Sequence, residues 1–427
     1  MKSTMLQEGR LQEILRTSRI EKRGGIWACC SSNPFVLRAA CRYAARENTV
    51  LLAESSSAQV NQYGGYSGMT PGQFCSALHM TAQKEGLPAD RLILGADHAG
   101  PLPWRQLNET EAMRRAERLI ADCVEAGYEK IHIDVSMPLG EERLSGNHCD
   151  SSTREIYEDI MTERGVRLIA AAENAWSASR KEERTPPLYV IGNEVPESGG
   201  IQQACQQRYS SGEHCLAMLK RYRERLQEAG YGEAAGRIIA MAADVGTGFF
   251  RDGVLKPDVS RLSDLSEVSE RAGIVFEGHS ADYLDMDLLQ AMTENGISIL
   301  KVGPELTNAL LKALFFLENL ERKDCGESSR SRLKETLFGC MIKDPVHLHK
   351  WMRMETVGET EVEQMRKIAF GPLDRWRYYA NRPEVQKSVC RLLKNLSGSA
   401  MPAPEDFLIK NIMTVIEKYD KAAVFHR

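Results

Sequence analysis

Eight short apolar segments, separated by longer amphipathic ones, constrain the fold of this chain more than any other feature. Each is five or six residues long and is flanked by turn residues, which favours buried strands over helices. Eight strand–helix units in series predict an α/β protein with a (β/α)8 barrel, and a doubly wound open sheet is the alternative. The segments are Ile26–Cys30, Val50–Glu54, Leu92–Asp97, Lys130–Val135, Leu188–Asn193, Ile238–Ala242, Ile274–Gly278 and Ser298–Val302.

The segments between these strands carry helix-start and helix-stop signals. Asn108–Ala126 begins with a capping residue, has one apolar stripe and is followed by Gly127, a combination typical of a surface helix. Pro34, Pro71 and Pro304 stand where other helices are expected to begin, a position that tolerates proline.

Three regions are expected along the chain. Residues 1–24 form a helical segment, residues 25–320 form the barrel, and residues 321–427 form a helical C-terminal region. The charged, Ser-rich stretch Glu321–Arg332 is interpreted as the linker between the last two.

Composition excludes several classes of protein. The 427 residues carry 55 Lys+Arg against 59 Asp+Glu, a net charge of −4. We therefore expect neither a nucleic-acid partner nor a membrane surface as partner. The 11 cysteines contain no Cys-x-x-Cys pair, which favours reduced thiols in a cytoplasmic protein. No phosphate-loop or dinucleotide-binding pattern is present.

Two histidines follow predicted strands at the face where barrel enzymes place their sites. Asp97-His98 ends the third strand, and His279 follows Gly278 at the end of the seventh. An imidazole beside a carboxylate suits a metal ligand with an acid/base group next to it. A core histidine with a structural aspartate is the alternative for the first pair.

Other carboxylates complete this candidate site. Glu194, after the fifth strand, would complete a two-histidine, one-carboxylate metal set and is also a catalytic candidate, or else it caps a loop. Asp134 lies near the end of the fourth strand and is a catalytic candidate, and Ser136, just beyond the strand, is a substrate-binding candidate. His132 on the same strand is interpreted as a buried interior residue.

Substrate-binding candidates follow the second and eighth strands. Glu54 and Gln62 belong to a polar run suited to sugar hydroxyls, although a solvated loop fits equally. Gly64-Gly65-Tyr66-Ser67 precedes a helix start and is suited to an anion. Lys301 is a candidate Schiff-base lysine, or more often the partner of a carboxylate or a substrate phosphate.

Several stretches resemble the accessory, non-catalytic subunit family of class II D-tagatose-1,6-bisphosphate aldolase. They are ESSSAQVNQYGGYSGMTP, LILGADHAGP, KIHIDVSM, YVIGNEVPESGG, FEGHSADYL and LKVGPELT, followed more weakly by FGPLDRWRYY. A more distant likeness to class II aldolases matches Asp97 and His98 to their Asp-His pair and His279 to a metal-binding histidine, with Glu194 replacing a further histidine.

The resemblance implies metal-dependent retro-aldol chemistry in carbohydrate metabolism. A ketose or ketose 6-phosphate of the fructose or tagatose type would be epimerised at C4 with a divalent ion, Zn²⁺ first and Mn²⁺, Ni²⁺ or Co²⁺ as other candidates. The alternative is a non-catalytic subunit that stabilises a separate class II aldolase. A homo-oligomer is compatible with either.

Overall fold

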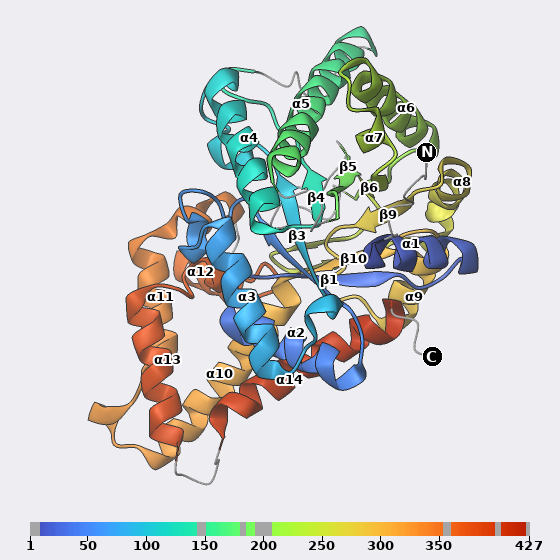
Figure 1. The fold of residues 1–427 in the computed structure, drawn as a ribbon. Helices are drawn as coiled ribbons and strands as arrows, with labels where there is room; N and C mark the ends of the chain where they lie inside the picture. The colour runs from blue at the N-terminus through green and yellow to red at the C-terminus, as the bar shows by residue number, and fades with distance from the viewer. Residues whose placement is uncertain are drawn as a thin grey trace.

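Eight parallel strands close into a barrel in a computed structural model (Figure 1). The structure describes residues 9–142, 151–179, 185–192, 207–352, 360–397 and 403–423. Neighbouring strands pair in the order β1-β10-β9-β6-β5-β4-β3-β2, and pairing of Ile26 with Ile299 joins the first barrel strand to the last. The predicted barrel is thereby confirmed over the open sheet.

All eight predicted strands are present, and their ends differ from the predicted ones by at most two residues. The barrel strands are β1 (Ile26–Cys30), β2 (Leu51–Ser56), β3 (Leu92–Ala99), β4 (Lys130–Ile133), β5 (Leu188–Ile191), β6 (Ile238–Ala243), β9 (Val275–Gly278) and β10 (Ile299–Val302). A short antiparallel hairpin, β7 (Gly248–Phe250) with β8 (Gly253–Leu255), follows β6 and was not predicted.

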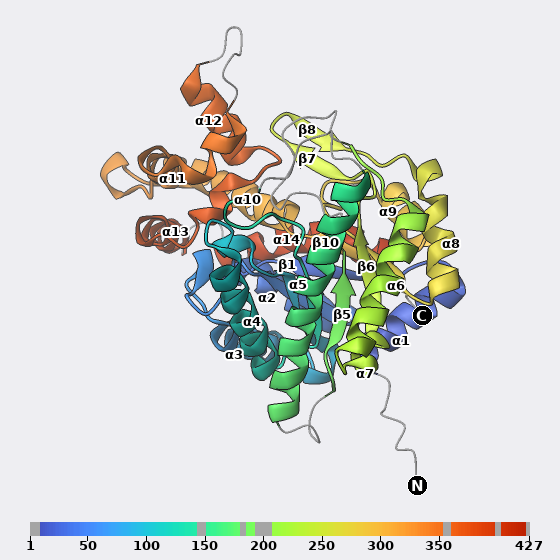
Figure 2. The same cartoon turned by 90° about the horizontal axis from the view of Figure 1, so that it is seen from above.

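Helices surround the barrel and extend beyond it (Figures 1 and 2). They are α1 (Arg10–Glu21), α2 (Pro34–Glu47), α3 (Pro71–Glu85), α4 (Glu109–Ala126), α5 (Ser151–Ala178), α6 (Gly212–Glu228), α7 (Gly232–Ala235), α8 (Ser263–Ala272), α9 (Met286–Glu294), α10 (Pro304–Asp324), α11 (Leu333–Lys343), α12 (Glu361–Phe370), α13 (Pro383–Leu396) and α14 (Pro404–Ala423). None of the helices in the described ranges combines the length and apolar character needed to cross a membrane.

The capping signals act as predicted. The Asn108 side chain accepts a hydrogen bond from the backbone N–H of Glu111, and Gly127 ends α4 in the left-handed conformation. The Thr70 side chain caps α3 in the same way, with Pro71 as its first residue. These local bonds satisfy amide groups that a helix start would otherwise leave unpaired.

Alternation along the strands divides the barrel interior into two layers. Toward the amino ends of the strands the inward residues are apolar, among them Ala28, Leu52 and Ile299. Leu11 and Leu15 of α1 pack into the same cluster, so this helix closes that end of the barrel. Toward the carboxyl ends the inward residues are charged, and they form the site described below.

Helices α11 to α13 lie to one side of the barrel, and α14 returns along α2, α9 and α10 (Figure 1). Arg38 and Arg42 of α2 bond to Glu405 and Asp406 at the start of α14, at 2.7 and 2.8 Å. The C-terminal region is thus packed on the barrel wall.

The predicted linker is partly helical. Helix α10 continues to Asp324, and Glu321 is fully buried. Its carboxylate accepts hydrogen bonds from the backbone N–H of Ser331 at 2.9 Å and from Asn395 Nδ2 at 2.6 Å. Glu321 and Ser331 thus pair inside the structure, while most of the other residues of this stretch are exposed, a difference that composition alone does not reveal.

The packing of α14 can be tested with Ile412→Ala. Ile412 is fully buried, and truncating such a side chain leaves a cavity that costs about 2–5 kcal/mol. We expect urea denaturation to show a loss of that size. Thr414→Ala, at an exposed position of the same helix, is the control and should change stability by less than about 0.5 kcal/mol.

Candidate metal and substrate site

A β-bulge places Asp97 and His98 at the mouth of the barrel. Ala96 pairs with Ile131 and Ala99 with Ile133, so β3 has an extra residue between these pairs. His98 takes up the bulge with a φ of +43°, a conformation that non-glycine residues adopt at an energetic cost. Adjacent strand residues normally face opposite sides, but here both side chains line one cavity.

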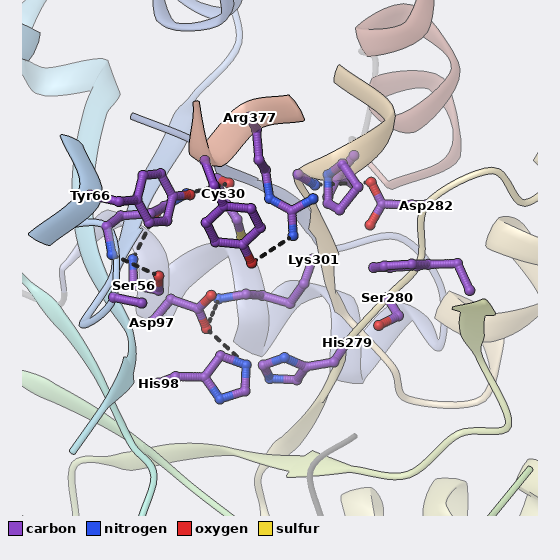
Figure 3. Close-up of a pocket in the computed structure, with 17 residues that line it drawn as sticks. Cys30, Ser56, Tyr66, Asp97, His98, His279, Ser280, Asp282, Lys301 and Arg377 are labelled. Atoms are coloured by element: carbon purple, nitrogen blue, oxygen red, sulfur yellow. Dashed lines mark hydrogen bonds and ion pairs between the residues drawn. The ribbon is translucent and has the colours of Figure 1, made fainter. Parts of the chain in front are cut away.

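Three imidazoles meet at this mouth. The ring centroids of His98, His132 and His279 are 4.6 to 5.2 Å apart, and all three residues are buried. Figure 3 shows His98 and His279 side by side beneath the cavity. The predicted convergence of these two residues, 181 positions apart, is therefore present. His132 lies in the interior as expected, but its ring also belongs to this cluster.

Two carboxylates complete the cluster. His132 Nδ1 lies 3.4 Å from both Asp97 Oδ1 and Glu277 Oε1, and His279 Nε2 lies 3.0 Å from Glu277 Oε1. One ligand-capable atom from each of Asp97, His132, Glu277 and His279 lies within 4.8 Å of all the others. Glu277 was missed, although its i, i+2 spacing from His279 on one strand was a usable signal.

The donor set fits a divalent cation. Imidazole nitrogens and carboxylate oxygens are ligands that zinc and related metals accept. His132 Nε2 is buried and has no hydrogen-bond partner among the described residues. Because buried polar atoms are normally paired, this nitrogen is one that an ion or a substrate would satisfy.

His98 is held by two polar residues outside the cavity. Its Nδ1 lies 2.6 Å from Asp134 Oδ2, and Asp134 Oδ1 accepts from the backbone N–H and hydroxyl of Ser136 at 3.0 and 2.6 Å. Such carboxylate–histidine pairs orient metal-binding rings. Asp134, predicted as catalytic, thus bonds His98, and Ser136, predicted as substrate-binding, bonds Asp134; neither residue lines the cavity.

Neighbouring charges act strongly on these groups. Burial opposes a charged imidazole, but the charge of Asp97 and the bond to Asp134 outweigh it and raise the pKa of His98 to about 9. Burial alone would raise the pKa of Asp97, but the charge of His98 and the bond from His132 hold it well below its usual range. Asp97 is therefore ionised at neutral pH.

An ion-pair layer lies directly beneath the imidazoles. Lys130 pairs with Glu54 at 2.7 Å and with Glu277, while Lys301 pairs with Glu54 and lies 2.8 Å from Asp97 Oδ1. Lys130, Glu54 and Glu277 are completely buried. Glu54, predicted to bind substrate, is thus engaged by two lysines, whereas Lys301 lines the cavity and pairs with carboxylates.

The cavity above this layer has about 670 Å³ of empty space, part of it open to solvent. Its size is in the range of small-molecule sites. Figure 3 shows Asp97, Lys301 and the two histidines on one side and Tyr66 and Arg377 on the other. The lining residues are Cys30, Ser56, Ala58, Gln59, Tyr66, Asp97, His98, Phe249, His279, Ser280, Asp282, Lys301, Val302, Gly303, Pro304, Arg377 and Tyr378.

The glycine-rich loop contributes only Tyr66 to this lining. The backbone N–H groups of Gly64 and Gly65 donate to Asn61, and those of Tyr66 and Ser67 donate to Ala58 and Gln59. Gly65 has a φ of +55°, and a Cβ there would lie 2.4 Å from the Gln59 carbonyl oxygen. The glycines therefore shape a tight loop, and these amide groups are not free for an anion.

Two further candidates lie away from the cavity or outside the described residues. Gln62 Nε2 donates to the Arg115 carbonyl at 2.9 Å. Glu194 lies outside the described residues, so its role as a metal ligand and catalytic group stays a prediction.

Fold and site together define a class of barrel protein. A parallel eight-stranded barrel carries imidazoles and carboxylates at the carboxyl ends of its strands, as metal-dependent barrel enzymes do. Within that class, residues 11–424 match the model of the D-tagatose-1,6-bisphosphate aldolase subunit GatZ/KbaZ-like family. The chain belongs to this family, which relates it to tagatose-bisphosphate aldolase.

Solved structures extend the comparison. The chain is similar to a probable tagatose 6 phosphate kinase from Sinorhizobium meliloti 1021, with 30% identity, a TM-score of 0.80, and 93% of this chain and 100% of that chain covered. A fructose-bisphosphate aldolase from Campylobacter jejuni has 15% identity, a TM-score of 0.45, and coverage of 96% and 94%. The latter values are too low to bear on function.

Metal binding can be tested with His279→Ala. His279 belongs both to the set predicted from the sequence and to the buried cluster, so its loss removes a ligand under either arrangement. We expect equilibrium dialysis with Zn²⁺ followed by metal analysis to show loss of stoichiometric binding, with an unchanged circular dichroism spectrum. His79→Ala, at an exposed position, should bind as the wild type does; retention of tight binding by His279→Ala would contradict the assignment.

The ion-pair layer predicts a large cost for Lys130→Met. The substitution leaves Glu54 and Glu277 each short of a cation in the interior, and removing one partner of a buried pair costs about 3–5 kcal/mol. Urea denaturation should report that loss. Lys84→Met, at an exposed site, is the control, and an equally small effect of both substitutions would rule out this layer as a major contribution to stability.

Proposed function

We propose that this chain is a divalent-metal-dependent epimerase that acts at C4 of a ketose or ketose 6-phosphate of the fructose or tagatose type. The observation that carries the proposal is the meeting of His98, His132 and His279, two of which line a cavity together with ionised Asp97. A purely structural subunit has no need of such a costly buried arrangement.

The reaction begins with loss of a proton from the C4 hydroxyl. The carboxylate of Asp97 accepts that proton, the C3–C4 bond breaks, C4 becomes an aldehyde carbon, and the electron pair passes into an enediolate on the other fragment. The three imidazoles would hold a divalent cation, with Zn²⁺ the first candidate, which would supply Lewis-acid stabilisation of negative charge on the ketose oxygens. Lys301, 2.8 Å from Asp97, fixes the carboxylate and adds positive charge.

Epimerisation requires the two fragments to rejoin. The aldehyde turns over inside the cavity, C3 attacks its opposite face, and the proton returns to the new C4 oxygen. The cavity lies over a closed barrel floor, which helps to keep both fragments in place. An aldolase would instead release both fragments. Epimerisation and aldol cleavage share the bond-breaking step, and they differ in whether the fragments are retained.

A second candidate function follows from the family. The matching family model describes an aldolase subunit, so the chain would bind and stabilise a separate class II aldolase and do no chemistry itself. In that case the purified chain should leave ketoses unchanged with every metal, and it should raise the stability or activity of the aldolase when the two are mixed.

The direct test is incubation of the purified chain with fructose 6-phosphate, tagatose 6-phosphate and the free ketoses. Each sugar is tested after chelation and after addition of Zn²⁺, Mn²⁺, Ni²⁺ or Co²⁺, and the products are separated by chromatography. We expect metal-dependent interconversion at C4. Absence of any conversion, together with stabilisation of an added class II aldolase, would favour the subunit function.

Asp97→Asn tests the acid/base role. The amide cannot accept the C4 hydroxyl proton, so kcat should fall by about 10²- to 10⁴-fold. Zn²⁺ content should remain, because the three imidazoles and the Glu277 carboxylate keep their ligand atoms. Asp90→Asn, at an exposed position, is the matched control, and wild-type turnover in Asp97→Asn would exclude this carboxylate as the base.

A further inference from the structure

The C-terminal region contributes Arg377 and Tyr378 to a cavity whose other lining residues belong to the barrel region. A short 3-10 turn, Arg375–Tyr378, lies over the barrel mouth, and its Arg377 lines the cavity opposite His98 and His279 (Figure 3). The side chain of Arg377 is mostly buried, with 12% of its surface exposed. Burying a charged guanidinium costs free energy unless its charge is compensated, so its position in a cavity of this size needs a physical explanation.

Local bonds hold the guanidinium in place. Arg377 Nη1 donates to the carbonyl oxygens of Leu373 and Asp374, each at 2.9 Å, and Nη2 donates to the Tyr378 hydroxyl at 3.2 Å. Its Nε has no hydrogen-bond partner among the described residues. Asp374 Oδ2 is the nearest carboxylate oxygen, at 3.5 Å, so the cation is oriented but not fully neutralised by a close ion pair.

Arg377 also stands where two cavities meet. A smaller cavity shares Cys30, Gln59, Tyr66, Gly303 and Arg377 with the one above the imidazoles. It adds hydroxyl and amide groups from the segment between β1 and α2, from the start of α10 and from the C-terminal region, namely Ser31, Ser32, Asn33, Thr307 and Asn381. Its lining contains no carboxylate.

Charge and shape therefore differ between the two ends of the combined space. One end holds the imidazoles and Asp97, where bonds would change. The other end holds Arg377 among hydroxyl and amide groups; the Asp282 carboxylate also lines the larger cavity there, and its Oδ1 accepts from the backbone N–H groups of Gly303 and Glu305. A planar guanidinium beside hydroxyl groups is well suited to an oxyanion, which it can bind through two parallel N–H bonds.

We infer that Arg377 binds a terminal oxyanion of the sugar substrate, at the end remote from the imidazoles, and so makes the C-terminal region the determinant of substrate specificity. The inference rests on the proposed function, since it concerns the substrate of the same site. A phosphate ester and a carboxylate share the required chemistry, and the experiment separates them.

The test compares wild type with Arg377→Gln and Arg377→Lys on three substrates: a ketose 6-phosphate, a ketohexuronate and the neutral ketose. Glutamine can still donate to the two carbonyl oxygens but lacks the charge. Because hydrogen bonds to charged groups are worth more than neutral ones, KM for the anionic substrate should rise about 10- to 100-fold in Arg377→Gln. KM for the neutral ketose and kcat should stay within about twofold, and lysine should restore part of the loss.

A rise in KM for the ketose 6-phosphate would identify a phosphate ester as the bound oxyanion, and a rise for the ketohexuronate would identify a carboxylate. Arg391→Ala, an exposed position in the same region, controls for the change in net charge, and Zn²⁺ content controls for the integrity of the imidazole cluster. Equal losses on anionic and neutral substrates, or no loss on either anion, would overturn the inference.

A binding measurement keeps this inference separate from the proposed function. Titration calorimetry with fructose 6-phosphate and with inorganic phosphate needs no turnover. Weaker binding of both by Arg377→Gln, in a chain that converts no sugar, supports the oxyanion site while the epimerase proposal fails. Unchanged binding in an active chain overturns the oxyanion site alone.

Discussion

The layer of ion pairs inside the barrel is the interaction on which the site depends. Lys130 and Lys301 stand among Glu54, Glu277 and Asp97, in an interior where a single unpaired charge would cost several kcal/mol. Because each lysine contacts at least two carboxylates, removing one group affects the others. Lys301 pairs with Asp97, and Lys130 pairs with Glu277 beside His132 and His279, so the layer contacts the site residues directly.

The same layer explains an otherwise puzzling glycine. A Cβ at Gly95 would lie 2.8 Å from Glu54 Cγ, so the neighbouring strand must carry no side chain there if Glu54 is to occupy the interior. Strand β3 then bulges two residues later, where Asp97 and His98 turn toward the cavity. In this short segment of β3, the glycine, the strand bulge and the buried charge of Glu54 are therefore required together.

Much of this architecture could be predicted from the sequence, because strand length, helix caps and proline positions are local signals. The pairing of His98 with His279 followed from their places at strand ends. Lys130 could not be distinguished from an ordinary strand residue until its partners were known, since a buried charge is recognisable only by what neutralises it, whereas Glu277 had a signal in its spacing from His279. Arg377 lies far along the chain, in a region that the strand–helix period does not reach.

At the glycine-rich loop, the sequence suggested a function that the structure does not support. Its composition suggested a cradle for an anion, yet Gly64, Gly65, Tyr66 and Ser67 direct their amide groups into the loop itself. A glycine-rich composition indicates that the loop can adopt a tight conformation. It does not indicate which acceptors the backbone N–H groups of the loop will bond to.

The closure of one end of the barrel by α1 bears on where a small molecule can reach the interior. Leu11 and Leu15 sit against inward apolar residues of the strands, and every member of that cluster is at most 5% exposed. Among the described residues, the amino end of the barrel is therefore closed by apolar packing, and the cavity lies at the opposite end. Tyr66 and Tyr378, whose rings lie 4.8 Å apart, belong to the lining of that cavity, so a molecule bound there would contact aromatic side chains from both the barrel and the C-terminal region.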